Sequence, residues 1–147
     1  MTLVPVPGYG AGDLSPEGNL AAWLDRLLMP GRLWQGTWDP EGLLSTLPAV
    51  VTSLLGIATG DWLQADKSGE AKTRGMLTAA ALLAALGLVW GLAFPINKNL
   101  WTSSFTLFTS GTALLLFGSM YWLIDVKRLR GPWCTWMVVF GMNAIAV

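Results

Sequence analysis

Two long uncharged stretches separated by a short polar hinge constrain this chain more than any other feature. Residues 75–94 and 100–124 contain no Asp, Glu, Lys or Arg, and the hinge Pro95-Ile96-Asn97-Lys98-Asn99 lies between them. At about 1.5 Å per residue in a helix, each stretch reaches roughly 30 Å or more, which is the hydrocarbon thickness of a bilayer. The pair therefore predicts two transmembrane helices that reverse direction at one membrane surface.

The composition also indicates a membrane protein. The chain is 53% hydrophobic and 12% charged, with a mean hydropathy of +0.51, whereas soluble domains are about one-quarter charged. Nine tryptophans suit a chain that crosses two membrane–water interfaces. Nine basic and nine acidic residues cancel, so no net positive field predicts nucleic-acid binding. With a single cysteine, Cys134, and no histidine, the sequence predicts neither a metal site nor a self-contained catalytic base.

Two further apolar stretches flank the central pair. Residues 42–60 precede it and contain Pro48, which we expect to kink the helix. Residues 133–147 follow it and reach only about 22 Å, so this last span stops in mid-bilayer. We therefore expect an all-α, polytopic integral membrane bundle of about four transmembrane helices, the last one truncated, in a piece of a longer protein. The expected spans are residues 42–60, 75–94, 100–124 and 133–147.

Residues 1–41 are more polar and predict a loop outside the bilayer that carries one amphipathic surface helix. Apolar residues recur there at helical spacing, namely Leu20, Trp23, Leu24, Leu27 and Leu28. Asn19 suits the N-cap of this helix, and Pro30-Gly31 ends it. Two interpretations stay open: the helix lies on the membrane with Trp23 among the lipid headgroups, or it packs on protein.

The basic residues predict the orientation. Six of the nine lie in residues 61–74 and 125–132, and the other three are Arg26, Arg32 and Lys98. Because basic residues are enriched in cytoplasmic loops, the first group is expected in the cytoplasm. Residues 1–41 and the hinge then share the extracytoplasmic face.

The hinge is a candidate recognition surface. Asn97, Lys98 and Asn99 bring two carboxamides and an ammonium group to one membrane surface, closed in by Trp101. Lys98 alone would be explained equally well by simple solvation. Asp39 and Glu41 precede the first span on the same face. These carboxylates either interact favourably with the positive N-terminal end of that helix, or they lie opposite Lys98 and help to hold a polar substrate.

Polar residues inside the spans add further candidates. Asn143 lies about ten residues into the last span, where an unbonded carboxamide is costly, so it is either a helix–helix clamp or part of a ligand path. Thr102, Thr106 and Thr109 share one helix face. Their hydroxyls either bond carbonyls of their own helix or line a wet cavity. Glycine pairs that allow close helix approach occur at Gly56 and Gly60 and at Gly87 and Gly91.

Four motifs in a fixed order resemble one family. They are Trp38-Asp39-Pro40-Glu41-Gly42, Pro95-Ile96-Asn97-Lys98-Asn99-Leu100-Trp101-Thr102, Ile124-Asp125-Val126 and Gly141-Met142-Asn143-Ala144-Ile145. Through essentially the whole chain, this order is similar to the heparan-alpha-glucosaminide N-acetyltransferase family and its bacterial relatives. The opening Val4-Pro5-Val6-Pro7-Gly8-Tyr9-Gly10 resembles the bacterial branch, which implies the bacterial inner (plasma) membrane.

The resemblance implies a polytopic enzyme that takes an acetyl group from cytosolic acetyl-CoA and delivers it across the membrane to an amino sugar or a similar acceptor. The family's proposed catalytic histidine lies in an N-terminal half that this chain lacks, so missing N-terminal helices are implied partners, beside the lipid bilayer. The chain would then supply contacts rather than a catalytic residue. On this reading, substrate contacts come from Asp39, Glu41, Asn97, Lys98, Asn99 and Trp101 at the outer face, and Asn143 lies on the route between the two faces.

Two other functions fit the same residues. In a transporter or scaffold, the hinge would bind a solute that is not chemically changed. Alternatively, the chain is an inactive truncated product that inserts into the membrane and does nothing further.

Overall fold

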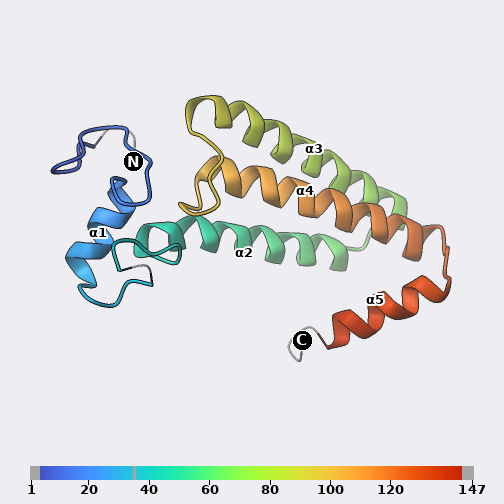
Figure 1. The fold of residues 1–147 in the computed structure, drawn as a ribbon. Coiled ribbons are helices and arrows are strands. Elements are labelled where there is room, and N and C mark those ends of the chain that lie inside the picture. Colours follow the sequence, from blue (N-terminus) through green and yellow to red (C-terminus); the bar gives the residue numbers. More distant parts are fainter. Residues whose placement is uncertain (1–3, 35, 144–147) are drawn as a thin grey trace.

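The chain folds into a helical bundle, seen in a computed structural model that describes residues 4–34 and 36–143 (Figure 1). Within these residues there is no strand, and three helical segments are long and apolar enough to cross a membrane. The all-α membrane bundle expected from the sequence is thereby confirmed. The elements in order are α1 (Leu20–Leu28), α2 (Leu43–Gln64), α3 (Gly69–Ala93), α4 (Ser103–Tyr121), the π-helical turn η1 (Trp122–Val126) and α5 (Pro132–Met142).

The three spanning segments run side by side, and the bundle has two distinct ends (Figure 1). At one end the loop of residues 94–102 lies near the start of α2 and near α1; we call this the hinge end. At the other end are the turn between α2 and α3 and the loop that follows η1. We call this the basic end, because six of the nine basic residues lie there.

The starts of α3 and α4 differ from those of the uncharged stretches because capping side chains, rather than charges, set them. α3 begins at Gly69, where the Ser68 side chain accepts the N–H of Ala71, so charged residues such as Arg74 lie inside the helix. α4 begins only at Ser103, since Thr102 caps it. Residues 100–102 consequently belong to the hinge and not to the span.

The expected fourth span is only partly described. α5 covers 11 residues and begins with Pro132 in its first turn, a position where proline is well tolerated. It packs against no other helix in the described part of the chain and diverges from the bundle at the basic end (Figure 1). Residues 144–147 of this expected span lie outside the described residues, so the described part contains three helices of spanning length rather than four.

α3 and α4 form the tightest contact of the fold. A Cβ added to Gly87 would lie 2.5 Å from the backbone nitrogen of Phe108. One added to Gly111 would lie 2.5 Å from the backbone nitrogen of Ala84 and 2.8 Å from the carbonyl oxygen of Ala80. Only hydrogen fits at these two positions, so the glycines let the two backbones touch. Gly87, from the predicted pair Gly87 and Gly91, therefore lies at the contact between α3 and α4.

α2 packs more loosely than its neighbours. In its most apolar window 6% of the residues are buried inside the structure, against 17% for α3 and 11% for α4. A Cβ added to Gly56 or Gly60 would meet no atom within 4 Å. Gly56 and Gly60 thus line an open groove between α2 and the other two helices and make no close helix contact.

α1 packs on protein with one face and leaves the other exposed. Its predicted N-cap is confirmed, since the fully buried Asn19 accepts the N–H of Ala22 at 2.8 Å. Ala21, Ala22 and Asp25 are buried, and α1 contacts α2 at the hinge end. Leu27 and Leu28, in the last turn of the helix, are exposed. The helix is therefore held by protein while an apolar edge stays available to a membrane surface.

The contact between α3 and α4 yields a testable prediction. Gly111→Ala should lower the free energy of unfolding by about 1–3 kcal/mol, because the new methyl group meets backbone atoms that cannot move aside. The matched variant Gly56→Ala should stay within about 0.5 kcal/mol of the wild type or gain stability, because alanine favours helix and the site is open. Thermal unfolding in detergent micelles measures both, and equal effects would contradict the assigned contact.

Candidate functional site

The hinge folds around two of its own side chains. The side-chain oxygen of Asn97 accepts the backbone N–H of Asn99 at 2.9 Å and that of Leu100 at 3.4 Å. In return, the backbone N–H of Asn97 donates to the Thr102 hydroxyl at 3.0 Å. The carboxamide of Asn97 thereby closes a turn, as asparagine side chains do in loops. Asn97 therefore holds the hinge in shape through its side-chain oxygen, while its side-chain NH2 group donates to no other described residue.

Thr102 is the centre of this arrangement and is almost completely buried. Its hydroxyl donates toward the carbonyl of Pro95 at 3.1 Å, and it also accepts the N–H of Phe105 at 3.4 Å, which caps α4. The hydroxyl of the fully buried Ser104 lies 3.1 Å away. The Thr102 side chain thus joins the loop that follows α3 to the start of α4.

Lys98 and Asn99 point outward from this scaffold. Both are exposed, and neither side chain makes a hydrogen bond or ion pair to another described residue. Trp101 has a left-handed backbone with φ of 47°, which is rare for a large side chain. Its ring contacts Phe105 edge-on at 5.5 Å between centroids, and its indole nitrogen is buried with no partner among the described residues. Lys98 and Asn99 are therefore the exposed polar side chains of the hinge, and Trp101 is half-buried against Phe105.

Asp39 shapes the entry to α2. Its two carboxylate oxygens accept the backbone N–H groups of Trp34 at 3.0 Å and of Glu41 at 2.9 Å. Glu41 itself is exposed. Asp39 therefore acts mainly on its own loop, and the Glu41 carboxylate bonds to no other described residue.

The start of α2 is held by Asp25, a residue that was not predicted from the sequence as part of the site. Its carboxylate reaches from α1 and accepts the N–H of Leu43, the first residue of α2, at 2.9 Å. The side chain is fully buried, and the second oxygen lies against Gly42 without a partner in the described residues. A signal was present: Asp25 follows the small residues Ala21 and Ala22 by four and three positions, so an acid falls on the same side of α1 as these two alanines.

Burial raises the pKa of Asp25 above the usual value for an aspartate. The hydrogen bond from Leu43 opposes this effect, the negative charge of Asp39 adds to it, and Arg26 reduces it. Arg26 is held in turn by the carbonyl of Thr37, which its guanidinium contacts at 2.7 Å. α1, the following loop and the start of α2 are thus joined around one buried acid.

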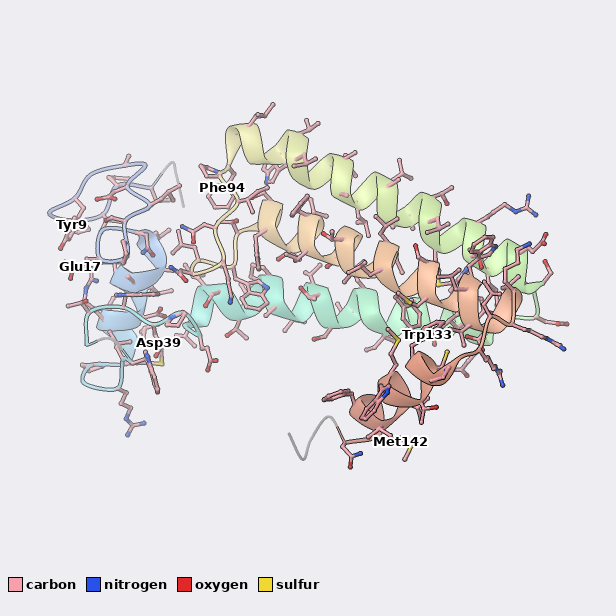
Figure 2. The ribbon with its side chains drawn as sticks, turned by 45° about the vertical axis from the view of Figure 1, so that its right-hand side comes forward. Tyr9, Glu17, Asp39, Phe94, Trp133 and Met142 are labelled. Carbon is pink, nitrogen blue, oxygen red and sulfur yellow. The ribbon has the colours of Figure 1, made fainter. Side chains whose placement is uncertain are left out.

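Most predicted contact residues lie at one end of the molecule. The hinge and the loop that carries Asp39 are both at the hinge end (Figure 2). No ion pair joins Lys98 to Asp39 or Glu41 within the described part of the chain, so the predicted opposition of these charges is not a direct contact. Asn143 stands apart: it ends α5, is exposed, and donates to the carbonyl of Val139 at 2.7 Å.

The hydroxyls of α4 differ in whether they have a hydrogen-bond partner. Thr109 donates to the carbonyl of Phe105 at 2.7 Å, and Thr112 donates to that of Phe108. Thr106 and Ser110 instead have buried oxygens with no partner among the described residues. Bonding within the helix therefore explains some of these side chains and leaves two without a partner.

The comparisons with known proteins agree with the motifs. The chain is 31% identical to the heparan-alpha-glucosaminide N-acetyltransferase of Mus musculus, over 98% of the chain. It is also 31% identical to the protein of the same name from Homo sapiens, over 99% of the chain. In both cases the chain spans about a quarter (26%) of the relative's length. No family model and no solved structure matches.

The scaffold role of Thr102 can be tested with two substitutions. Thr102→Val removes the hydroxyl and leaves the buried N–H of Asn97 without its acceptor, at a cost of about 1–3 kcal/mol in stability. Thr102→Ser keeps the hydroxyl and should lose less than half as much. Thermal unfolding and protease cleavage within residues 94–102 report the effect. A loss in Thr102→Ser as large as that in Thr102→Val would show that the methyl group contributes as much as the hydroxyl, and a loss in Thr102→Ser alone would contradict the role given to the hydroxyl.

Asp25 predicts an unusual pH dependence. Because its pKa is raised on folding, the folded protein binds this proton more tightly than the unfolded chain does, so its contribution to stability falls as the pH rises from the usual aspartate pKa through the raised one. Asp25→Asn should abolish this fall while still accepting the N–H of Leu43. Hydrogen exchange of α1 and the first turn of α2, followed from pH 4 to 7, measures it.

The control for this measurement is Asp13→Asn. Hydrogen bonds from Ser15 lower the pKa of the exposed Asp13, so its contribution has the opposite sign. The fall in stability attributed to Asp25 should therefore persist in Asp13→Asn. If the fall disappears in Asp13→Asn, it does not come from Asp25.

Proposed function

We propose that this chain, which belongs to the heparan-alpha-glucosaminide N-acetyltransferase family, forms part of a transmembrane enzyme that transfers an acetyl group from acetyl-CoA to an amino sugar or a similar amine. The observation that carries the proposal is the 31% identity through nearly the whole chain. It is supported by the fold, since the longest polar motif of the resemblance occupies an ordered loop at the end of two spanning helices.

We assign acceptor binding to the hinge end. Lys98 and Asn99 offer an ammonium group and a carboxamide that suit the hydroxyls of a sugar, and the Trp101 ring offers an apolar face. The charges of residues 1–42 and the hinge are three basic and five acidic, while the basic end has six basic and four acidic residues. A protonated amino sugar is attracted to the first end and an anionic coenzyme to the second.

Glu41 and Asp39 would complement the acceptor's positive charge from the entry of α2. Asn97 then acts as a positioning residue that holds Lys98 and Asn99. We keep Asn143 as a candidate on the route between the faces, supported by its place in the shared Gly141-Met142-Asn143 motif and by an amide oxygen with no partner in the described residues.

The transfer itself requires a neutral amine to attack the thioester carbonyl. The C–N bond forms as the C–S bond breaks, coenzyme A leaves as the thiolate, and the amine loses one proton. That proton needs a base, and this chain has no histidine. We therefore assign the base to the part of such enzymes that this chain does not span. Polar groups of the chain would partly stabilise the oxyanion that forms during attack.

The three apolar helices make the chain an integral membrane protein. We propose further that the basic end faces the cytoplasm and the hinge end the opposite side, following the distribution of basic residues. A bacterial plasma membrane is proposed from the opening motif alone, and the compared relatives are mammalian.

The hinge assignment predicts a selective kinetic effect. In the full-length enzyme carrying this segment, Lys98→Ala should raise KM for the amine acceptor about tenfold or more and leave KM for acetyl-CoA unchanged, because only acceptor contacts are lost. Transfer of a radiolabelled acetyl group to a glucosaminide measures this. Arg32→Ala, an exposed cation of the same face outside the hinge, is the control.

Other outcomes discriminate among the alternatives. Unchanged acceptor kinetics in Lys98→Ala would remove the hinge from the site. Solute passage across vesicles without consumption of acetyl-CoA would favour a transporter over an enzyme.

A further inference from the structure

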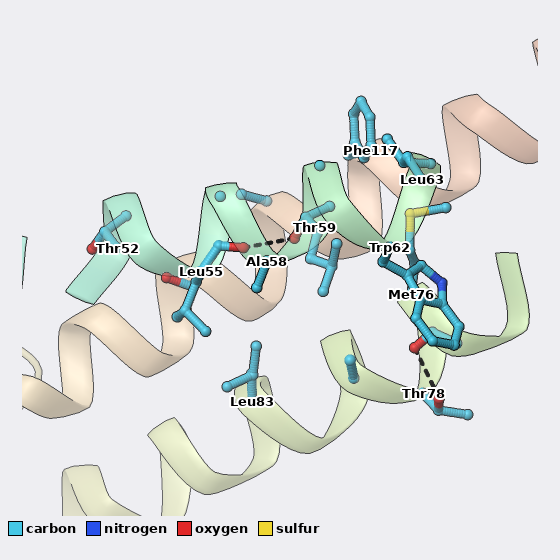
Figure 3. Close-up of a pocket in the computed structure, with 17 residues that line it drawn as sticks. Thr52, Leu55, Ala58, Thr59, Trp62, Leu63, Met76, Thr78, Leu83 and Phe117 are labelled. Atoms are coloured by element: carbon cyan, nitrogen blue, oxygen red, sulfur yellow. Dashed lines mark hydrogen bonds between the residues drawn. The ribbon is translucent and has the colours of Figure 1, made fainter. Parts of the chain in front are cut away.

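Two cavities lie on opposite faces of the α3 and α4 pair. Toward α2, Met76 and Leu83 line the open groove, where a cavity of about 840 Å³ extends along α2 (Figure 3). The second cavity measures about 510 Å³ and is lined by α3, the end of α4 and η1. Since each residue turns a helix by about 100°, Glu70 and Leu77 of this lining lie on roughly the opposite side of α3 from Ala79 of the groove. No other described element lines the second cavity, so it opens toward the lipid.

The α3 wall of the second cavity changes in character with depth. Leu77 lies within the uncharged stretch of residues 75–94. Arg74 is the first charged residue outside that stretch, and Glu70 lies four residues, or about 6 Å, further toward the water. Going outward, the wall is therefore apolar, then cationic, then anionic.

Arg74 and Glu70 are both exposed and unpaired in the described structure. Their spacing of four residues permits an ion pair on a helix, but neither side chain forms an ion pair or a hydrogen bond with another described residue. The start of α3 is nevertheless packed, since a Cβ added to Gly69 would lie 2.9 Å from a methyl carbon of Val126 in η1. A ligand in the cavity would meet both charges beside a fixed helix end.

The other wall comes from the end of α4 and from η1. The Ser119 hydroxyl already donates to the carbonyl of Leu115 at 2.7 Å, and Leu123 adds apolar surface. Trp122 is 38% exposed, and its indole N–H donates to no other described residue. The ammonium nitrogen of Lys127 lies 5.2 Å from the centroid of that indole ring. Tryptophan is enriched at the membrane–water interface, so this wall also marks the level of the lipid headgroups.

The charges around the second cavity cancel. Among its lining residues, Arg74 is the cation and Glu70 is the anion. Asp125 and Lys127 at η1 are exposed, lie outside the lining and also have opposite signs. The other charged residues of the basic end do not line the cavity. The matching ligand therefore carries one negative and one positive group rather than a net negative charge.

We propose that this cavity binds a phospholipid with a primary ammonium headgroup, phosphatidylethanolamine. From the hydrocarbon outward, such a lipid presents an acyl chain, glycerol esters, a phosphate and an ammonium group. The acyl chain would lie along Leu77 and Leu123. Arg74 would bind the phosphate and Glu70 would accept the N–H groups of the ammonium, both as charge-assisted hydrogen bonds. The indole N–H of Trp122 would donate to an ester carbonyl.

The order and spacing of these groups favour a lipid over a further transmembrane helix. The step of about 6 Å from Arg74 to Glu70 matches the headgroup layer, which is roughly 5–7 Å deep on each side of the hydrocarbon. The bilayer that α3 and α4 cross supplies lipid to this face. A helix would cover the leucines but would not bring a phosphate and an ammonium group in the required order. The site takes no part in acetyl transfer and is independent of the proposed function.

Headgroup selectivity of the unsubstituted full chain is the first test. Native mass spectrometry in detergent, with equal amounts of phosphatidylethanolamine, phosphatidylcholine and phosphatidylglycerol of the same acyl chains, measures how much of each lipid binds. Phosphatidylethanolamine should bind at least about fivefold more than either competitor, because choline has no N–H for Glu70 and glycerol has no positive charge. Equal binding, a preference for phosphatidylglycerol, or the absence of bound lipid overturns the proposal.

Two substitutions then assign the contacts. Glu70→Gln should reduce the preference for phosphatidylethanolamine over phosphatidylcholine to less than about twofold, because both lipids keep the phosphate contact. Arg74→Gln should lower the binding of both lipids about tenfold, because the phosphate contact is lost. Asp66→Asn and Arg130→Gln are matched controls, since these exposed charges of the basic end lie outside the lining. Unchanged selectivity in Glu70→Gln, or equal losses in the controls, would place the lipid elsewhere and overturn the proposal.

Discussion

The rest of the structure depends on the direct approach of the α3 and α4 backbones. In a bilayer, apolar side chains gain little by leaving lipid for a neighbouring helix, so close packing has to hold helices together. Gly87 and Gly111 allow this packing because they place hydrogen where any other residue would meet backbone atoms. The pair then serves as the rigid element against which the hinge and α2 are arranged. The same contact places the end of α3 and the start of α4 close enough for a short connection.

That connection has to satisfy backbone groups at the end of a membrane helix, where few partners are available. The side chains of Asn97 and Thr102 satisfy these backbone groups. The motif predicted as a recognition surface is therefore partly a scaffold. The division is physical: residues whose polar atoms are used inside the loop are buried or half-buried, and Lys98 and Asn99 are exposed. A hinge held this firmly can present two side chains in a fixed geometry, which lowers the entropy cost of binding.

Much of the fold could be predicted because membrane spans depend on local composition. Long uncharged stretches gave α3 and α4, and helical spacing with Asn19 gave α1 and its cap. The first residue of each helix was harder to predict. α3 includes Lys72 and Arg74 and begins after the Ser68 cap, whereas a prediction based on the absence of charge begins at Gly75. The sequence does not reveal which glycine pair makes a contact. Gly56 and Gly60 have the same spacing as Gly87 and Gly91 but face open space.

The sequence predicted the polar loop between α3 and α4, but neither the buried acid of α1 nor the spacing of the helices. Asp25 escaped notice because its partner, the N–H of Leu43, lies 18 residues away and belongs to a different helix. The cavity along α2 also depends on how three helices are spaced, which no local pattern records. Long-range placement, rather than residue type, is the information that the sequence reading lacked.

The π-helical turn η1 has a consequence for how the length of this chain can change. The N–H of Lys127 bonds the carbonyl of Trp122, five residues earlier, so η1 holds one residue more than an α-helical turn. Each residue of an α-helix advances the side chains by about 100°. Deleting one residue from η1 can therefore be absorbed by restoring an ordinary turn, whereas deleting one from the first half of α4 would rotate Gly111 away from α3. Natural length variation among relatives is consequently expected to gather at the basic end and to spare the helices that hold the hinge.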